Sequence, residues 1–327
     1  MRRQTPPKRQ KPGRPAKTPG GAPLSGMKRV PPVTFVGGTG RSGTHIVARL
    51  LGRHGKLKLI PVECRFHVDA ERGLPALLEG RTTKRAFLRR LKGFWWRGFQ
   101  TGRMRGMYNF VPRERFTEAV TKFEERFDAD PEAASRDLFW DVVWPHDAEE
   151  EVSGIVEQSC DTTAQAPTLL RLFPEASFVH VVRDGRDASA SRVSQTRGIV
   201  YPRTRAQGIE WWDRRLRQMD AGARGIPDEV FAEVSLDELL ADPGRDTLEK
   251  IFAVTRLTPA RQVRKFLRNK MSAQEANTER WRAGLRPEKR RRIDALYREA
   301  LDRLEDDGVS SVPLLRTTYE RRKGNGS

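Results

Sequence analysis

The amino-acid sequence predicts an α/β fold of three layers, in which a central parallel sheet carries helices on both faces. Short apolar runs at 33–36, 57–60, 153–157 and 177–182 are typical of buried strands, and longer amphipathic stretches separate them. Four glycines fall within seven residues directly after the first run, at 37, 38, 40 and 43, as expected of a tight turn from a strand into a helix. We therefore expect a single α/β domain over residues 31–318.

The two ends of the chain are predicted to lie outside this domain. Residues 1–30 hold nine Lys or Arg, no Asp or Glu, and many Pro and Gly. Such a segment buries too little apolar surface to order itself, so we expect a disordered basic arm. The basic residues 319–327 are predicted to form a frayed tail.

Charge and cysteine content limit the classes of function. The net charge is +19, and residues 31–327 keep 53 basic against 43 acidic side chains, a balance that favours anionic substrates. The basic arm could contact anionic lipid or nucleic acid without specificity. With only two cysteines, no apolar run of transmembrane length and no secretory signal, a cytoplasmic location is expected.

The first strand and the helix at 44–53 enclose a loop suited to binding an anion. The unpaired N–H groups of a helix N-terminus and the helix dipole both favour negative charge at this point. The spacing of Gly38 and Gly43 fits a nucleotide-binding G-x-x-x-x-G-K-[ST] loop, but Thr44 and His45 replace the lysine and the magnesium-binding hydroxyl. Arg41 supplies a cation inside the loop instead. A phosphorylated nucleotide that needs no metal is therefore the better ligand.

A second anion site is predicted after the strand at 177–182. Arg183 ends this strand, and Ser191 follows on the next helix after a turn at Asp184 and Gly185. An arginine fork and a serine placed in this way can bind one phosphate from two sides. The alternative is a buried arginine that pairs with Asp184 or Asp187.

The remaining stretches complete the fold. A second strand at 57–60 is followed by Glu63, whose alternative to a functional role is an exposed ion pair with Arg65. The aromatic clusters at 94–99 and 139–144 are interpreted as core packing in preference to acceptor binding. A long helix is expected from Glu210, an edge strand at 230–234 and an amphipathic helix at 286–304. The five histidines have no metal-ligand spacing, so no metal site is predicted.

These motifs resemble those of sulfotransferases that use 3′-phosphoadenosine 5′-phosphosulfate (PAPS), over roughly residues 33–285. The sequence Gly40-Arg-Ser-Gly-Thr44 is similar to the family's 5′-phosphosulfate loop, and the run ending in Val182-Arg-Asp-Gly-Arg186 to its 3′-phosphate motif. The Arg-Ser-Gly-Thr form and Glu63-Cys64-Arg65 are closest to the tyrosylprotein sulfotransferases and their bacterial relatives.

The resemblance implies a P-loop-like fold, a PAPS donor, the product 3′-phosphoadenosine 5′-phosphate (PAP) and no required metal. It implies Arg41 and Glu63 as catalytic residues, with Glu63 as general base. The implied donor-binding residues are Gly40, Arg41, Ser42, Gly43, Thr44, His45, Arg183, Ser191 and Arg280. The acceptor would be a hydroxyl of a small molecule, a carbohydrate or a peptidyl tyrosine.

Two departures from the family pattern bear on the mechanism. Gln158 stands where many relatives carry a lysine that binds the transferring sulfuryl group, and Arg65 is a candidate replacement for that charge. His67 follows Glu63 by four residues, and cytosolic sulfotransferases use a histidine base, but a solvent-exposed loop histidine is the preferred interpretation.

Two other functions stay open at this point. A P-loop kinase or other phosphotransferase would show magnesium dependence, although positions 44 and 45 disfavour it. A non-catalytic polyanion-binding protein would depend on the basic arm and on salt concentration. The oligomeric state is not encoded in any pattern that we find.

Overall fold

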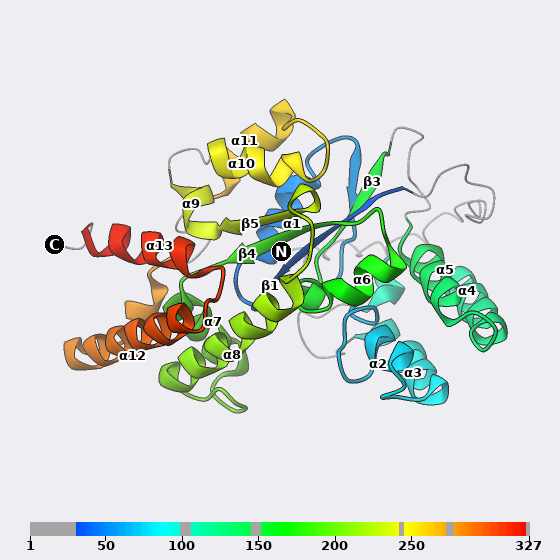
Figure 1. Cartoon of the computed structure of the whole chain (residues 1–327), viewed down its shortest axis with the longest axis horizontal. Coiled ribbons are helices and arrows are strands. Elements are labelled where there is room, and N and C mark those ends of the chain that lie inside the picture. The colour runs from blue at the N-terminus through cyan, green and yellow to red at the C-terminus, as the bar shows by residue number, and fades with distance from the viewer. Residues whose placement is uncertain (1–30, 99–105, 145–151, 242–244, 273–277, 325–327) are drawn as a thin grey trace, which may run out of the picture.

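The computed structural model describes residues 31–98, 106–144, 152–241, 245–272 and 278–324 (Figure 1). The predicted basic arm, residues 1–30, lies outside them. Within the described residues the architecture is the predicted one, a parallel sheet flanked by helices.

In the described part of the chain, the central sheet has five parallel strands in the order β2-β3-β1-β4-β5. They are β1 (Val33–Gly38), β2 (Leu57–Leu59), β3 (Gly154–Glu157), β4 (Ser177–Val182) and β5 (Phe231–Ser235). The expected edge strand is thus present, one residue later than predicted. After β1 the chain crosses toward β2, whereas after β4 it crosses toward β5. The carboxyl ends of β1 and β4 therefore form the point where the winding reverses, which is where such sheets bind ligands.

Helices lie on both faces of the sheet, as Figure 1 shows. They are α1 (Thr44–Leu51), α2 (Leu74–Leu78), α3 (Lys84–Arg90), α4 (Arg113–Arg126), α5 (Pro131–Val143), α6 (Ala166–Leu172), α7 (Gly185–Thr196), α8 (Arg205–Ala223), α9 (Leu236–Leu240), α10 (Arg245–Ala253), α11 (Arg261–Lys270), α12 (Pro287–Asp306) and α13 (Val312–Gly324). The helix predicted from Glu210 begins earlier, at Arg205, because the Thr204 hydroxyl accepts a hydrogen bond from the Gln207 N–H and caps it.

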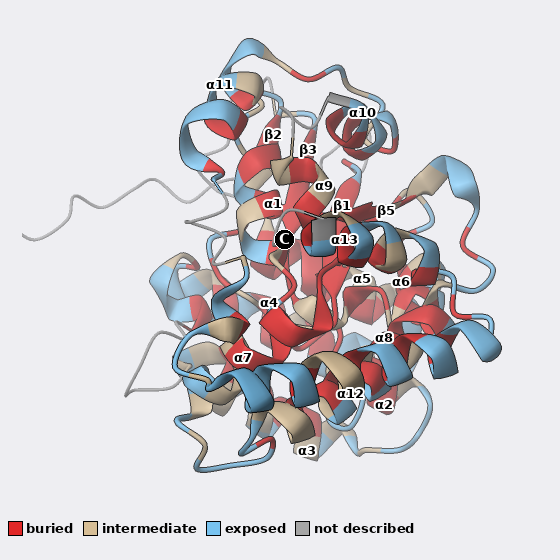
Figure 2. Ribbon diagram, turned by 90° about the vertical axis from the view of Figure 1, so that its left-hand side faces the viewer, coloured by how far each residue is buried: buried red, intermediate tan, exposed pale blue. Residues whose placement is uncertain are grey.

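Side chains that alternate along the strands build two core layers, one on each face of the sheet. Val33 and Phe35 of β1 pack with α2 to α6, whereas Val36 packs with α1, α10 and α11. A third cluster joins α7, α8, α12 and α13 beside β4. In Figure 2 the buried residues are concentrated in the sheet and on the helix faces turned toward it. The aromatic residues Trp95, Phe139 and Trp140 belong to the first layer, which confirms their interpretation as core packing.

The prediction of a frayed tail from residue 319 was wrong for the residues that the structure describes. Helix α13 continues to Gly324. Tyr319 is buried and donates a hydrogen bond to Asp294 of α12, and Arg322 is only 8% exposed. The sequence Arg321-Arg-Lys323 suggested a solvated end, but three buried carboxylates surround the second of these residues.

Candidate active site

The glycine loop between β1 and α1 has the geometry of an anion cradle. Gly40, Arg41 and Gly43 all adopt positive φ, at 84°, 62° and 101°. This conformation is uncommon for an arginine. Among the described residues, no group accepts a hydrogen bond from the N–H of residues 40–44. The Ser42 hydroxyl is likewise buried and without a partner there. These unmet donors fit a phosphate or sulfate group of a ligand.

The glycines of this loop serve the fold as well as the ligand. A Cβ on Gly37 would lie 2.4 Å from the hydroxyls of Thr162 and Thr163. A Cβ on Gly43 would lie 2.7 Å from a methyl group of Leu236. The glycine-rich sequence therefore lets the loop pack closely against two neighbouring segments, in addition to leaving its N–H groups accessible.

The two predicted anion-binding motifs meet in the structure. Arg41 donates a hydrogen bond from Nε to the Ser191 hydroxyl, at 2.9 Å. Arg183 donates from a terminal guanidinium nitrogen to the carbonyl of Arg41, at 3.0 Å. Burial, together with the nearby Arg183, lowers the pKa of Arg41 below its ordinary value. These two contacts join residues that are 150 and 142 positions apart in the sequence. They bring the positive charges of Arg41 and Arg183 together at the carboxyl ends of β1 and β4.

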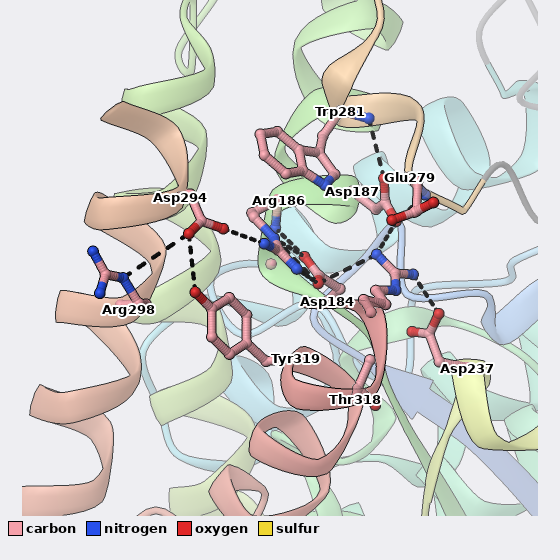
Figure 3. Close-up of polar contacts among 12 residues, drawn as sticks. Asp184, Arg186, Asp187, Asp237, Glu279, Trp281, Asp294, Arg298, Thr318 and Tyr319 are labelled. Atoms are coloured by element: carbon pink, nitrogen blue, oxygen red, sulfur yellow. Dashed lines mark hydrogen bonds and ion pairs between the residues drawn. The ribbon is translucent and has the colours of Figure 1, made fainter. Parts of the chain in front are cut away.

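The acidic residues after Arg183 form a structural network with other partners (Figure 3). Asp184 accepts hydrogen bonds from the backbone N–H and the side chain of Arg186. Arg322 of α13 pairs with Asp184, Asp187 and Asp237. Arg186 also pairs with Asp294 and lies over the ring of Trp281, at 4.8 Å. This network fixes the start of α7, and so fixes the positions of Arg183 and Ser191.

The segment that contains Arg280 is fastened to the same network. Asp187 accepts hydrogen bonds from the backbone N–H groups of Glu279 and Trp281, at 2.8 and 3.2 Å. Trp281 is buried against α7, whereas Arg280 is exposed. The structure therefore attaches this segment to the motif that follows β4. A contact between Arg280 and a phosphate stays a prediction.

Glu63 and Arg65 lie on the loop after β2 and form an ion pair at 3.1 Å. Cys64 between them is buried, so the two charged side chains share the accessible side of the loop. Arg65 has a φ of 61° and donates its backbone N–H to the hydroxyl of Ser159. Burial raises the pKa of Glu63 above its ordinary value, with Arg65 opposing the shift. Glu63 is close enough to Arg41 for the two charges to interact.

Gln158 is held inside the fold. It is 2% exposed, its amide oxygen lies 2.7 Å from Nδ1 of His45, and its amide nitrogen donates to the carbonyl of Ile60. Because an amide oxygen only accepts, Nδ1 of His45 carries the proton in this contact. Gln158 therefore orients His45 at the start of α1, and both of its polar groups are already used.

His67 is not the exposed loop histidine that the sequence suggested. Its side chain is fully buried and stacks on Phe35, and its Nε2 lies 3.1 Å from the carboxylate of Glu157. Glu157 also accepts two hydrogen bonds from Ser159. Burial by itself would raise the pKa of Glu157, but His67 and Ser159 lower it below its ordinary value. A histidine enclosed in this way cannot reach an acceptor hydroxyl, which removes it as a competitor of Glu63.

Five residues that the sequence analysis did not assign to the site also lie beside the loop or pair with a residue there. A Cβ placed on Gly40 would contact Trp211 of α8 at 3.7 Å and the Cys160 sulfur at 4.0 Å. Arg192 lies over the Trp211 ring at 5.6 Å. Arg215 pairs with Asp161 and donates to the carbonyl of Thr39. One signal was available, because Arg192 directly follows Ser191 on the helix that carries the second motif.

Other features of the described residues lie away from this loop. A surface groove between α8 and α12 is lined by Tyr201, Arg214, Arg217 and Arg303, among others. In the part of the chain that the structure describes, no group of three or more His, Cys, Asp or Glu side chains could hold a metal ion. No helix there is both long and apolar enough to cross a membrane.

Comparison with known proteins identifies the family. The profile of the sulfotransferase family matches residues 32–260, about 70% of the chain, which includes the glycine loop, Glu63 and the motif after β4. The chain belongs to the sulfotransferase family. No curated protein gave a significant match.

Several solved structures are similar to this chain. The sulfotransferase domain of the Synechococcus PCC 7002 olefin synthase is 18% identical, with a TM-score of 0.46 over 80% of this chain and 91% of that one. The sulfotransferase STF1 of Mycobacterium tuberculosis H37Rv is 16% identical, with a TM-score of 0.45 over 79% of this chain and 78% of its own. The sulfotransferase domain of the curacin biosynthetic pathway is 13% identical, with a TM-score of 0.47 over 85% and 99%.

Proposed function

We propose that this sulfotransferase moves a sulfuryl group from PAPS to an acceptor hydroxyl, with Glu63 as general base. The observation that carries the proposal is the direct contact of the two anion-binding motifs, through Arg41, Ser191 and Arg183. PAPS bears anionic groups at both its 5′ and 3′ positions, and two adjacent cationic sites match that pattern.

The residues divide between the two ends of the donor. The N–H groups of residues 40–44 and the side chain of Arg41 would hold the 5′-phosphosulfate, with Ser42, Thr44 and His45 around it. Arg183, Ser191 and Arg280 would hold the 3′-phosphate, which ordinary adenylates lack. Because Arg183 is buried at the end of a central strand and Ser191 is fixed on α7, the cation and the hydroxyl are preorganised.

The proposed transfer step conserves atoms and charge. The acceptor oxygen attacks sulfur and forms a new S–O bond while its proton passes to the Glu63 carboxylate. The bond between sulfur and the bridging oxygen breaks, and its electron pair stays on the phosphate of PAP, where Arg41 stabilises the growing negative charge. The raised pKa of Glu63 suits this role, because a base gains proton affinity as its pKa approaches the working pH.

The acceptor and the cellular setting belong to the same proposal. A small-molecule, carbohydrate or peptidyl-tyrosine hydroxyl would each present the proton that Glu63 removes. A cytoplasmic location agrees with the two free cysteines. The basic arm would contribute only non-specific contacts with anionic lipid or nucleic acid.

Calorimetric titration with PAP in EDTA tests the proposal. Wild-type protein should bind PAP with micromolar affinity and 5′-AMP much more weakly, and Arg183→Ala should lose PAP binding. The exposed Arg291 of α12 offers a control, since Arg291→Ala removes the same charge at a position outside the proposed donor-binding residues. If wild-type protein ignored PAP and bound ATP with magnesium, the PAPS assignment would be wrong and a phosphotransferase would be the function to pursue.

A further inference from the structure

Three arginines lie close enough to Cys160, beside the glycine loop, for their charges to interact with it. Arg41 and Arg65 approach it from the loops after β1 and β2, and Arg192 from α7. Trp211 lies next to both the loop and Arg192. A Cβ on Gly40 would be 3.7 Å from its ring, and the Arg192 guanidinium lies over that ring at 5.6 Å. Side chains from five separate segments therefore converge on one small region.

Within the described residues, acidic side chains balance only part of the positive charge of this cluster. Glu63 pairs with Arg65, and Asp161 pairs with Arg215. Within the described residues, neither Arg41 nor Arg192 forms an ion pair, and the buried Nε of Arg192 has no hydrogen-bond partner. Burial raises the pKa of Cys160 to about 12, so its thiol stays neutral and supplies no anion.

A positive charge is lacking at Gln158, two residues before Cys160. Gln158 brings no charge, and both of its polar groups are used by His45 and Ile60. Arg65 is partly neutralised by Glu63 and would be neutralised further whenever Glu63 is ionised as a base. Within the described residues Arg192 has no such acidic partner. Its guanidinium lies over the ring of Trp211, and one terminal nitrogen donates to Gln195.

We propose that Arg192 is a catalytic residue that binds the oxygen atoms of the transferring sulfuryl group and supplies the charge that Gln158 cannot. This inference rests on the proposed function. The guanidinium offers two N–H groups in one plane, which matches two oxygens of a sulfuryl group. Arg192 exchanges no proton during the transfer. It holds the same oxygens as sulfur passes from the phosphate oxygen of PAP to the acceptor oxygen.

The sulfuryl group is present in PAPS and absent from PAP, so the two affinities separate this role from general binding. Arg192→Gln should lower the affinity for PAPS by about tenfold or more while changing the affinity for PAP less than twofold. Arg192→Lys should recover part of the loss. Arg291→Gln on α12 is the charge-matched control, and the circular dichroism spectrum checks the fold of each variant.

Three results would overturn the assignment. If Arg192→Gln lowered PAP and PAPS affinity equally, Arg192 would hold the nucleotide and not the sulfuryl group. If neither affinity changed in Arg192→Gln, Arg192 would be a surface charge with no part in donor binding. If wild-type protein bound neither ligand, the proposed function itself would fail, and the role of Arg192 with it. The proposal is supported if Arg192→Gln loses the preference for PAPS over PAP while Arg291→Gln keeps it.

Discussion

At the scale of single residues, the site depends on side chains whose neighbours set their charge. Glu63 lies in a half-buried loop that favours its neutral form, while Arg65 at 3.1 Å favours its ionised form. Arg41 is crowded by Arg183 and Arg192, so it gains from the arrival of an anion. The chemistry of these residues comes from the way β1, β2 and β4 end at one edge of the sheet.

The role of Glu63 predicts a pH-dependent rate. A base must be deprotonated, so the rate should fall as pH drops through a pKa that lies above the ordinary value for glutamate. Glu63→Gln should lower the turnover rate about 10²- to 10⁴-fold and remove this acidic limb from the pH–rate profile. Glu71→Gln, an exposed position on the same connection, is the control. An unchanged acidic limb in Glu63→Gln would assign the base to another residue.

At the scale of elements, the conformation of one loop and the position of one helix decide the geometry of the site. The glycine loop needs positive φ at residue 43 and close packing on Leu236. Helix α13 needs Arg322 because three carboxylates converge on it, one at the N-cap of α7, one within α7 and one in α9.

Gly43→Ala should damage both the fold and the site. A Cβ would meet Leu236 at 2.7 Å while φ stayed near 101°, so we expect a loss of about 1–3 kcal/mol in unfolding free energy. PAP affinity should fall as well. Gly55→Ala, where a Cβ would contact nothing within 4 Å, should change neither quantity. Equal urea midpoints for the two variants would contradict the importance of this conformation.

Arg322→Met should destabilise the protein by about 3–5 kcal/mol, because it leaves buried carboxylates without their cation. Urea denaturation measures this directly. The neighbouring Arg321→Met is the control, since Arg321 lies outside the carboxylate network. A frayed tail would predict no effect from either substitution, so a small value for Arg322→Met would reinstate that interpretation.

Much of the fold and of the site could be predicted from the sequence, and the failures have identifiable causes. The sequence predicts β1, β4 and the glycine loop because each is encoded by a short run of neighbouring residues. The burial of His67 against Glu157 and the ion pairs of Arg322 depend on contacts across 90 and 85 or more positions, which no local pattern reveals. The nearness of Arg192 to Cys160 follows from the same kind of long-range packing.

At the scale of the whole molecule, the net charge of +19 has two separable sources. Part is gathered around the glycine loop, where it serves a small ligand. The other large part is the nine basic residues of positions 1–30, in a segment that the sequence predicts to be disordered.

Deleting residues 1–30 should therefore separate two activities. Binding to a DNA duplex, and its dependence on salt, should weaken strongly because fewer phosphates are neutralised. PAP affinity should stay within twofold of the full chain. Titrations of both proteins at two salt concentrations measure this, and a parallel loss of PAP binding would show that the arm takes part in the site.

The network around Arg322 also bears on how the enzyme is made. During synthesis β1, the glycine loop and β4 leave the ribosome long before α13. A nascent chain therefore holds both predicted anion-binding motifs while Asp187 and Asp237 still lack Arg322. Nucleotide binding competence would thus be acquired late in synthesis, and products of premature termination upstream of residue 322 would accumulate as chains with intact motifs and no working site.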